Sequence, residues 1–265
     1  QKTTFSFEFF PPKTPQASEE LFRTISELVP LLPSFVSITY GAGGSTRTLT
    51  QSLSIRLRKE TGLNVVSHLT CVGTSRKEAA DLLDKYRQNE IANIMALRGD
   101  PQGKNIAAYT PEEGFAYASD LVSFIRKNYP NFCIGVAGYP EGHPETPNRI
   151  KEMEYLKQKV DEGANYICTQ LFFDNRDFFD FCERCEISGI RVPIIAGIMP
   201  ITSRSTMQRM AELAGGTRYP ARLLKALSRV QDDQGFEQVG IHWATEQVLD
   251  LLDKNVRGIH FYTLN

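Results

Sequence analysis

The chain has 265 residues and a net charge of −1, so it is the right length for one α/β barrel and carries no basic field that would recruit nucleic acid. Its apolar fraction of 41% is typical of a globular protein, and no apolar run reaches the roughly 20 residues that span a membrane. Five cysteines, an odd number in a chain this long, favour reduced thiols in the cytoplasm over a disulfide framework.

Eight short segments rich in β-branched and aromatic residues recur along the chain. They cover residues 4–10, 35–40, 64–71, 91–99, 133–140, 166–173, 192–200 and 258–265. Several are nearly continuous apolar runs, which is typical of parallel strands that are buried on both faces.

Segments with a helical period lie between these strands. They cover residues 18–29, 75–88, 110–128, 147–162, 174–188, 203–214, 219–230 and 236–255. Three of them carry start signals: a capping box from Ser75 to Glu78, the group Thr110, Pro111 and Glu113, and an N-cap at Asp174. The alternation predicts an α/β protein with helices outside a parallel sheet, and eight repeats favour a closed (β/α)₈ TIM barrel over an open sheet. Without a proline- or glycine-rich linker, we expect a single domain over residues 1–265.

Polar residues gather where the predicted strands end, which is where such barrels place their chemistry. These residues are Glu8, Thr39, Tyr40, His68, Thr70, Arg98, Gly99, Asp100, Tyr139, His143, Gln170 and Tyr262.

Glu8 is the strongest candidate for a catalytic residue because phenylalanines flank it on both sides. Strand alternation places Glu8 and Phe10 on one face and Phe7 and Phe9 on the other. An inward carboxyl group in an apolar barrel mouth is costly to ionise, so its pKa should rise, and such a group can act as a general acid near neutral pH. A structural carboxylate paired with a buried arginine or lysine is the alternative.

Asp100, in the run LRGD, is a second carboxylate that could face Glu8 across the mouth. It could instead pair with Arg98 or cap a helix. A lone histidine such as His68 is more often a core residue than a ligand, and no histidine pair has metal-ligand spacing, so we predict no metal site.

Two further motifs carry weak signals. Cys182 and Cys185 form a CxxC pair, but both fall on the apolar stripe of a predicted helix, which favours core packing. The loop GAGGS over residues 41–45 resembles a phosphate-binding turn without the full glycine motif, and a flexible turn explains it equally well.

Eight motifs in chain order resemble the methylenetetrahydrofolate reductase family. They are FSFEFFPPKT, FVSITYGAG, SHLTC, ALRGDP, YASDLV, AGYPEGHPE, KVDEGANYICTQLFFD and HFYTLN, and they run from residue 5 to residue 265. The chain resembles the bacterial-length form, and it shows no sign of the regulatory domain that eukaryotic members carry.

The resemblance implies a barrel that holds FAD, accepts hydride from NADH or NADPH, and passes it to 5,10-methylenetetrahydrofolate to give 5-methyltetrahydrofolate, in one-carbon and methionine metabolism. It implies that Glu8 is the general acid and that Asp100 contacts the pterin and tunes the flavin. It places Gln170, Thr39 and Tyr262 at the substrates.

Flavin contacts are also implied by the resemblance. They fall on Tyr40, Ala42, His68, Arg98, Gly99, Asp100, Tyr117, Ala118, Tyr139, His143, Glu152, Tyr155 and Lys159. The chain departs from the family pattern at Glu152, Tyr155 and Gln158, so the adenosine end of the cofactor could be held differently. Bacterial relatives associate, so we also expect a homo-oligomer.

Other functions remain open at this point. A methyltetrahydrofolate-dependent methyltransferase would bind a similar pterin without flavin, and proline dehydrogenase is another FAD barrel. Outside enzymes, a barrel could bind folate or a nucleotide as a sensor. Such a sensor would not need a general acid, so Glu8, Asp100 and Gln170 at strand ends argue against it.

Overall fold

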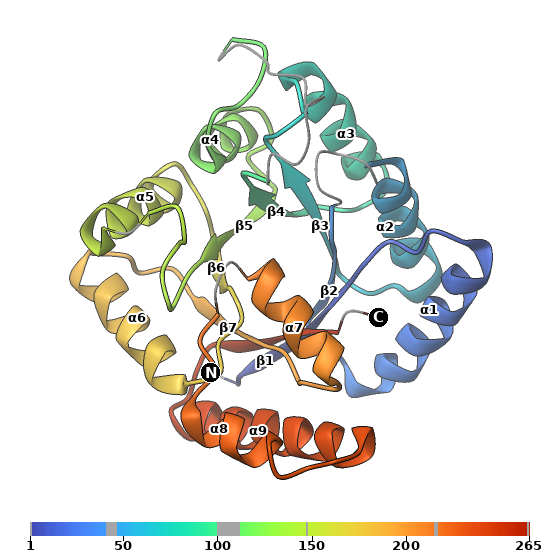
Figure 1. Cartoon of the computed structure of the whole chain (residues 1–265). Coiled ribbons are helices and arrows are strands. Elements are labelled where there is room, and N and C mark those ends of the chain that lie inside the picture. Colours follow the sequence, from blue (N-terminus) through green and yellow to red (C-terminus); the bar gives the residue numbers. More distant parts are fainter. Residues whose placement is uncertain (1, 41–46, 100–111, 147, 215–216, 264) are drawn as a thin grey trace. The chain divides into compact units, whose positions relative to one another are not determined.

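The strands of the computed structural model confirm the predicted (β/α)₈ fold. The structure describes residues 2–40, 47–99, 112–146, 148–214, 217–263 and 265, so the predicted site residues Ala42 and Asp100 lie outside the described residues. The strands form a closed barrel in the order β1 to β8 (Figure 1). Their bounds are β1 Thr4–Phe9, β2 Phe35–Ile38, β3 Val65–Thr70, β4 Asn93–Leu97, β5 Cys133–Gly138, β6 Tyr166–Thr169, β7 Ile194–Ile198 and β8 Gly258–Tyr262.

Helices alternate with these strands along the chain. They are α1 Pro15–Leu28, α2 Arg47–Thr61, α3 Arg76–Gln88, α4 Ala118–Asn128, α5 Arg149–Asp161, α6 Asn175–Ile187, α7 Arg204–Leu213, α8 Ala221–Leu227 and α9 Asp233–Asp253, with a 3₁₀ turn at Val29–Leu31. Two predicted starts are confirmed. Ser75 and Glu78 form the capping box of α3, and the Asp174 side chain accepts a hydrogen bond from the backbone N–H of Arg176 at the start of α6.

The start predicted for the helical segment 110–128 is wrong, and α2 was not predicted. Residues 112–117 form turns and bends, and Thr110 and Pro111 lie outside the described residues. Helix α4 begins instead at Ala118, because the carboxylate of Asp120 accepts the backbone N–H groups of Ala116 and Tyr117 at 3.1 and 2.9 Å.

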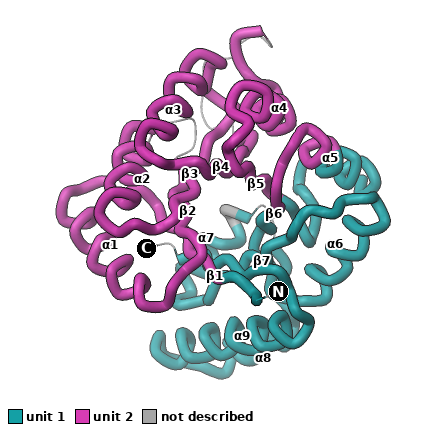
Figure 2. The backbone as a smooth tube through the Cα atoms, turned by 180° about the vertical axis from the view of Figure 1, so that it is seen from behind, with its two compact units in different colours: residues 1–4, 138–157, 167–263 teal, residues 5–137, 158–166, 264–265 magenta. Residues whose placement is uncertain are grey.

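The chain divides into two compact units, shown in different colours in Figure 2. Unit 1 comprises residues 1–4, 138–157 and 167–263, and unit 2 comprises residues 5–137, 158–166 and 264–265. The prediction of a single domain over residues 1–265 stays a prediction, and each unit is described by itself.

The core of unit 2 sets the orientation of strand β1. Phe9 is buried against α1, α2 and β2, with Leu21, Ile25, Val36 and Leu57 among its neighbours, and Phe7 packs against the same cluster. The phenylalanines therefore point toward the helices, and alternation turns Glu8 to the opposite face of the strand. This confirms the predicted separation of Glu8 from Phe7 and Phe9.

In unit 1, helix α9 is fastened to the chain that follows β6. Trp243 Nε1 donates to the carbonyl oxygen of Phe173 at 3.0 Å, and the buried Gln247 Nε2 donates to that of Phe172 at 3.1 Å. These bonds fix the backbone two and three residues beyond Gln170, and so they help to define where Gln170 projects.

Candidate active site

Glu8 lies in a polar cluster built from three neighbouring strands of unit 2. The residue is 8% exposed. Ser37, its partner in the register of β1 and β2, donates its hydroxyl to Glu8 Oε2 at 3.2 Å. His68 of β3 brings Nε2 to 3.2 Å from the same oxygen, which is an ion-pair distance without hydrogen-bond geometry. These two contacts come from a hydroxyl and an imidazole.

Two buried polar atoms beside this cluster have no hydrogen-bond partner among the described residues. They are Thr39 Oγ1 and His68 Nε2. The backbone of Thr39 is fully used, because its N–H donates to Phe9 at 2.9 Å and its carbonyl oxygen accepts the Thr50 hydroxyl at 2.9 Å. Burying a polar atom without a hydrogen bond costs about 1–3 kcal/mol, although His68 Nε2 keeps its 3.2 Å ion-pair contact with Glu8 Oε2.

The end of β4 brings Arg98 and Gly99 into the same unit. The backbone N–H of Val72 donates to the Arg98 carbonyl at 3.0 Å. Gly99 has a φ of +80°, and a Cβ there would lie 3.0 Å from the Cβ of Thr70. Glycine is therefore required, because its conformation is left-handed and its neighbour is close.

The other predicted flavin contacts of unit 2 lie on several different elements. Tyr117 is the N-cap residue of α4 and is 64% exposed, and Ala118 is the first residue of that helix. Lys159, in the last turn of α5, donates Nζ to the carbonyl oxygen of Ala137 on β5 at 2.6 Å. The Tyr40 ring follows β2, and its hydroxyl accepts a hydrogen bond from Arg47.

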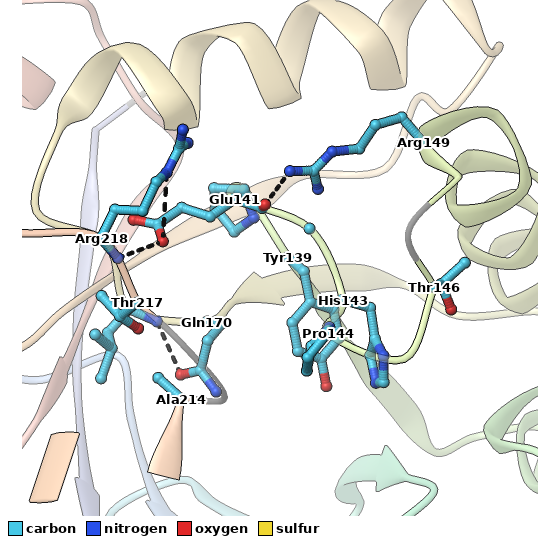
Figure 3. A pocket seen from close by; sticks show the side chains of 13 residues that line it. Tyr139, Glu141, His143, Pro144, Thr146, Arg149, Gln170, Ala214, Thr217 and Arg218 are labelled. Atoms are coloured by element: carbon cyan, nitrogen blue, oxygen red, sulfur yellow. Dashed lines mark hydrogen bonds and ion pairs between the residues drawn. The ribbon is translucent and has the colours of Figure 1, made fainter. Parts of the chain in front are cut away.

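Unit 1 contains a cavity of about 260 Å³. Three predicted site residues, Tyr139, His143 and Gln170, contribute to its wall (Figure 3). The remaining lining residues are Pro140, Glu141, Gly142, Pro144, Thr146, Arg149, Leu171, Ala214, Thr217 and Arg218. The cavity therefore brings together residues that follow β5 and β6.

The amide of Gln170 has a defined orientation in this cavity. Its Oε1 accepts the backbone N–H of Leu171 at 2.9 Å, and its own backbone N–H donates to Gly138 at 2.7 Å. One of the two acceptor sites of the oxygen is filled, and the Nε2 group adds two N–H donors, so Gln170 can donate a hydrogen bond to a ligand.

Tyr262, at the end of β8, lies within the same unit. Its hydroxyl donates to the carbonyl oxygen of Thr169 at 2.6 Å, immediately before Gln170. It also packs its ring against the buried His260 at 5.2 Å. The structure therefore ties Tyr262 to the backbone that carries Gln170.

Glu141 is a cavity residue that the sequence reasoning missed, although it stands in the conspicuous run YPEGHPE. Its Oε2 accepts the backbone N–H of Arg218 at 2.8 Å, and its carbonyl oxygen accepts a hydrogen bond from the Arg149 guanidinium (Figure 3). Burial raises the pKa of Glu141, and the bond from Arg218 offsets only part of this. Its Oε1 is buried and has no hydrogen-bond partner among the described residues.

His143 and Glu152 are joined through the loop that follows Tyr139. Glu152 is 6% exposed. Its Oε1 accepts the backbone N–H of His143 at 3.1 Å, and its Oε2 pairs with Arg149 at 3.1 Å. The Tyr139 and His143 rings meet edge to face at 4.6 Å. Glu152 therefore shapes the loop, whereas Tyr155 is 55% exposed on the same helix.

Within the described residues, no group of three or more His, Cys, Asp or Glu side chains could hold a metal ion. The same part of the chain contains no helix that is both long and apolar enough to cross a membrane. Burial raises the pKa of the Cys182 and Cys185 thiols to about 12, which agrees with core packing rather than thiolate chemistry.

The closed strand order and the polar residues at the strand ends place the chain among the (β/α)₈-barrel proteins with a candidate active site. The chain belongs to the methylenetetrahydrofolate reductase family, whose family model matches residues 1–265.

Curated relatives agree with this assignment. The chain is 42% identical over 275 aligned positions to methylenetetrahydrofolate reductase (NADH) 1 of Arabidopsis thaliana, in an alignment that covers 100% of the chain and 46% of the plant protein. It is 39% identical to the 5,10-methylenetetrahydrofolate reductase of Escherichia coli, over 98% of the chain and 86% of that protein. The chain thus spans less than half the length of the plant relative and most of the bacterial one.

Solved structures support the fold. A protein from Clostridium thermocellum that binds two copies of 5-methyl-5,6,7,8-tetrahydrofolic acid superposes with a TM-score of 0.66 at 16% identity, over 100% of this chain and 90% of that one. The structure of 2,3-dimethylmalate lyase gives a TM-score of 0.52 at 9% identity, over 96% of this chain and 93% of that one. At these identities the likeness concerns the fold alone.

Proposed function

We propose that the chain reduces 5,10-methylenetetrahydrofolate to 5-methyltetrahydrofolate with electrons from a reduced nicotinamide nucleotide, through FAD. The observation that carries the proposal is the polar cluster around Glu8 in a chain that matches its family from residue 1 to residue 265. The plant relatives are named for NADH, which favours NADH over NADPH as the electron donor.

The residues present fit a flavin. Thr39 Oγ1 and His68 Nε2 are buried polar atoms without a described hydrogen-bond partner, and a flavin ring offers several nitrogen and oxygen atoms that could satisfy them. The left-handed Gly99 packs against Thr70 directly after Arg98, which the resemblance also assigns to the flavin. In unit 2, Tyr40 follows β2 and Arg98 follows β4; in unit 1, Tyr139 and His143 follow β5.

When bound, the flavin would accept a hydride from the nicotinamide and donate it to the folate. The chain itself would move one proton. In our proposal Glu8 gives its proton to a nitrogen of the five-membered ring of the folate, which opens that ring to a reactive iminium. Ser37 and His68 lie against Oε2 of Glu8, so they orient the acid toward the substrate.

Gln170 has a separate role in binding. Because its Nε2 group carries two N–H donors, we propose that Gln170 donates a hydrogen bond to a carbonyl oxygen of the nicotinamide or the pterin. Asp100 remains the proposed contact to the pterin, from the resemblance alone. The proposals of a raised pKa at Glu8, a homo-oligomer and a cytoplasmic location rest on the sequence and stay predictions.

A reconstitution experiment tests this function. The purified chain is loaded with FAD, and the formation of 5-methyltetrahydrofolate is followed with NADH or NADPH as the reductant. We expect product with FAD present and none when FAD or the nicotinamide is omitted. Flavin-independent product would favour a different barrel chemistry, and methyl transfer from 5-methyltetrahydrofolate without any nicotinamide would point to a methyltransferase.

A further inference from the structure

Arg47, the first residue of α2, makes hydrogen bonds to three separate segments of unit 2. Its Nε donates to the Tyr40 hydroxyl at 2.6 Å, and its Nη1 pairs with Glu78 Oε1 at 2.6 Å. Its Nη2 donates to the carbonyl oxygen of Gly73 and to the hydroxyl of Thr74, both at 2.9 Å. One guanidinium thus joins the second residue after β2, the turn after β3 and the first turn of α3.

Glu78 restricts the position of the Arg47 guanidinium because its carboxylate binds Arg47 and Ser75 at the same time. While its Oε1 meets Arg47, its Oε2 accepts the backbone N–H of Ser75 at 2.8 Å and the Ser75 hydroxyl at 2.9 Å. Burial favours the neutral acid, but the bonds from Ser75 and Arg47 outweigh it and lower the pKa of Glu78 to about 2. The ion pair therefore stays charged at neutral pH.

The turn after β3, to which Arg47 is hydrogen-bonded, also extends the backbone pairing of β3 with β4. Cys71 donates its backbone N–H to Leu97 at 3.0 Å, and Val72 donates to Arg98 at 3.0 Å. Gly99 then packs against Thr70 of β3. Arg47 is therefore linked through one turn to the segment that carries Arg98 and Gly99.

From these contacts we propose that Arg47 is a positioning residue for flavin binding, because it fixes the Tyr40 ring and the turn at residues 73–74. The inference rests on the proposed function, which assigns Tyr40, Arg98 and Gly99 to the flavin. Arg47 acts through these groups and need not touch the cofactor. Holding them in place before binding spares the ligand the entropy of ordering them, which raises affinity.

The arrangement specifically requires arginine. A planar guanidinium presents five N–H donors in a fixed fork, and here it reaches four acceptors on different sides of the group. A lysine ammonium keeps the charge but lacks the planar set of donors. It can therefore pair with Glu78, but it loses the hydrogen bond to Tyr40 or those to Gly73 and Thr74.

The test measures the dissociation constant of FAD for the apoprotein, from the quenching of flavin fluorescence. We compare the unaltered chain with Arg47→Gln, Arg47→Lys and Tyr40→Phe, which removes only the hydroxyl that Arg47 contacts. We expect Arg47→Gln to weaken FAD binding about tenfold or more and Arg47→Lys to fall between it and the unaltered chain.

Arg56→Gln is the matched control, since Arg56 lies on the same helix as Arg47 and its guanidinium also forms ion pairs with carboxylates. It contacts Glu60 at 2.8 Å and Glu19 at 3.1 Å. At 1.5 Å per residue it lies about 13 Å further along the helix axis than Arg47. This substitution should leave the affinity for FAD within about twofold of the unaltered chain while removing the same charge.

A second readout separates positioning from a general loss of structure. At saturating FAD, Arg47→Gln should let the nicotinamide reduce the flavin at close to the original rate. Equal FAD affinities for Arg47→Gln and Arg56→Gln would overturn the inference while leaving the proposed function intact. If Arg47→Gln does not fold, unchanged affinity in Tyr40→Phe and Arg47→Lys would overturn it. Failure of the unaltered chain to bind FAD would overturn both.

Discussion

At the residue scale, the hydroxyl of Ser37 is the contact to Glu8 that can be removed with least disturbance. It donates to Glu8 Oε2 from the neighbouring strand. A hydrogen bond to a neutral group contributes about 0.5–1.5 kcal/mol, so Ser37→Ala should slow folate reduction by roughly two- to tenfold and leave flavin reduction by the nicotinamide unchanged.

The two rates are measured separately by anaerobic rapid mixing. Ser54→Ala is a suitable control, because Ser54 is also fully buried but its hydroxyl meets Ser67 at 3.3 Å instead of Glu8. A Ser37→Ala variant that slows both steps equally would argue against a specific action on the acid.

Glu78 makes a pH-dependent contribution to stability. Its pKa in the folded chain is about 2, below the value of about 4.3 in an unfolded chain, so its contribution is complete above about pH 4.3 and is lost as the pH falls toward 2. The side chain is 39% exposed, and solvent screening reduces its contribution to about 1–2 kcal/mol.

Glu78→Gln should therefore unfold more easily than the unaltered chain at pH 7, by a free-energy difference that shrinks as the pH is lowered from 5 to 3. Denaturant unfolding at pH 7, 5 and 3 gives this difference directly. A difference that stays constant over this range would show that charge on Glu78 does not matter.

At the element scale, the loop between β5 and α5 depends on Gly142. Its φ is +95°, and a Cβ there would overlap the guanidinium of Arg149. Gly62 has a φ of +68° with nothing near its Cβ position, so it isolates the cost of the backbone conformation. Both alanine substitutions should cost about 1 kcal/mol of stability.

Only Gly142→Ala should affect the cavity. It displaces Arg149 from Glu152 Oε2 and from the carbonyl oxygen of Glu141. We expect the Michaelis constant for methylenetetrahydrofolate to rise several-fold in Gly142→Ala and to stay unchanged in Gly62→Ala. Equal constants for the two variants would show that Arg149 does not shape the binding site.

The elements themselves were predictable to different degrees. Parallel strands leave a strong signal because their residues are apolar on both faces, and all eight lie within the predicted segments. Helix α2 left little signal, since its buried positions are Thr50, Leu53, Ser54 and Leu57, and two of these four are hydroxyl residues. The start of α4 was misplaced because Asp120 competes with the signals around Thr110 as a cap.

Site positions could be predicted, whereas most contacts could not. Strand ends identified Glu8, Thr39, His68 and Gln170, and the structure places these side chains at strand ends. Ser37 stands two residues before Thr39 on the same strand, so its face could have been deduced from alternation. The contact of Arg47 with Tyr40 depends on how a helix start meets a strand end, and no spacing in the sequence encodes this.

At the scale of the whole molecule, separate residues of this chain are proposed to serve the two hydride transfers. In this proposal Glu8 and Ser37 are needed only when the folate ring is opened, whereas the flavin contacts, His68 among them, are needed for both steps. A substitution at Glu8 should therefore leave flavin reduction by the nicotinamide intact and abolish reduction of the folate. A loss of folding or of flavin binding would impair both steps.

The most direct measurement is anaerobic rapid mixing of flavin-loaded Glu8→Gln with NADH, followed by mixing with methylenetetrahydrofolate. We expect NADH to bleach the flavin of the variant at the rate seen in the unaltered chain. Reoxidation by the folate should be slower by about 100-fold or more, as expected for the loss of a general acid. Reoxidation at an unchanged rate, or an equal loss of both steps, would contradict the division of roles.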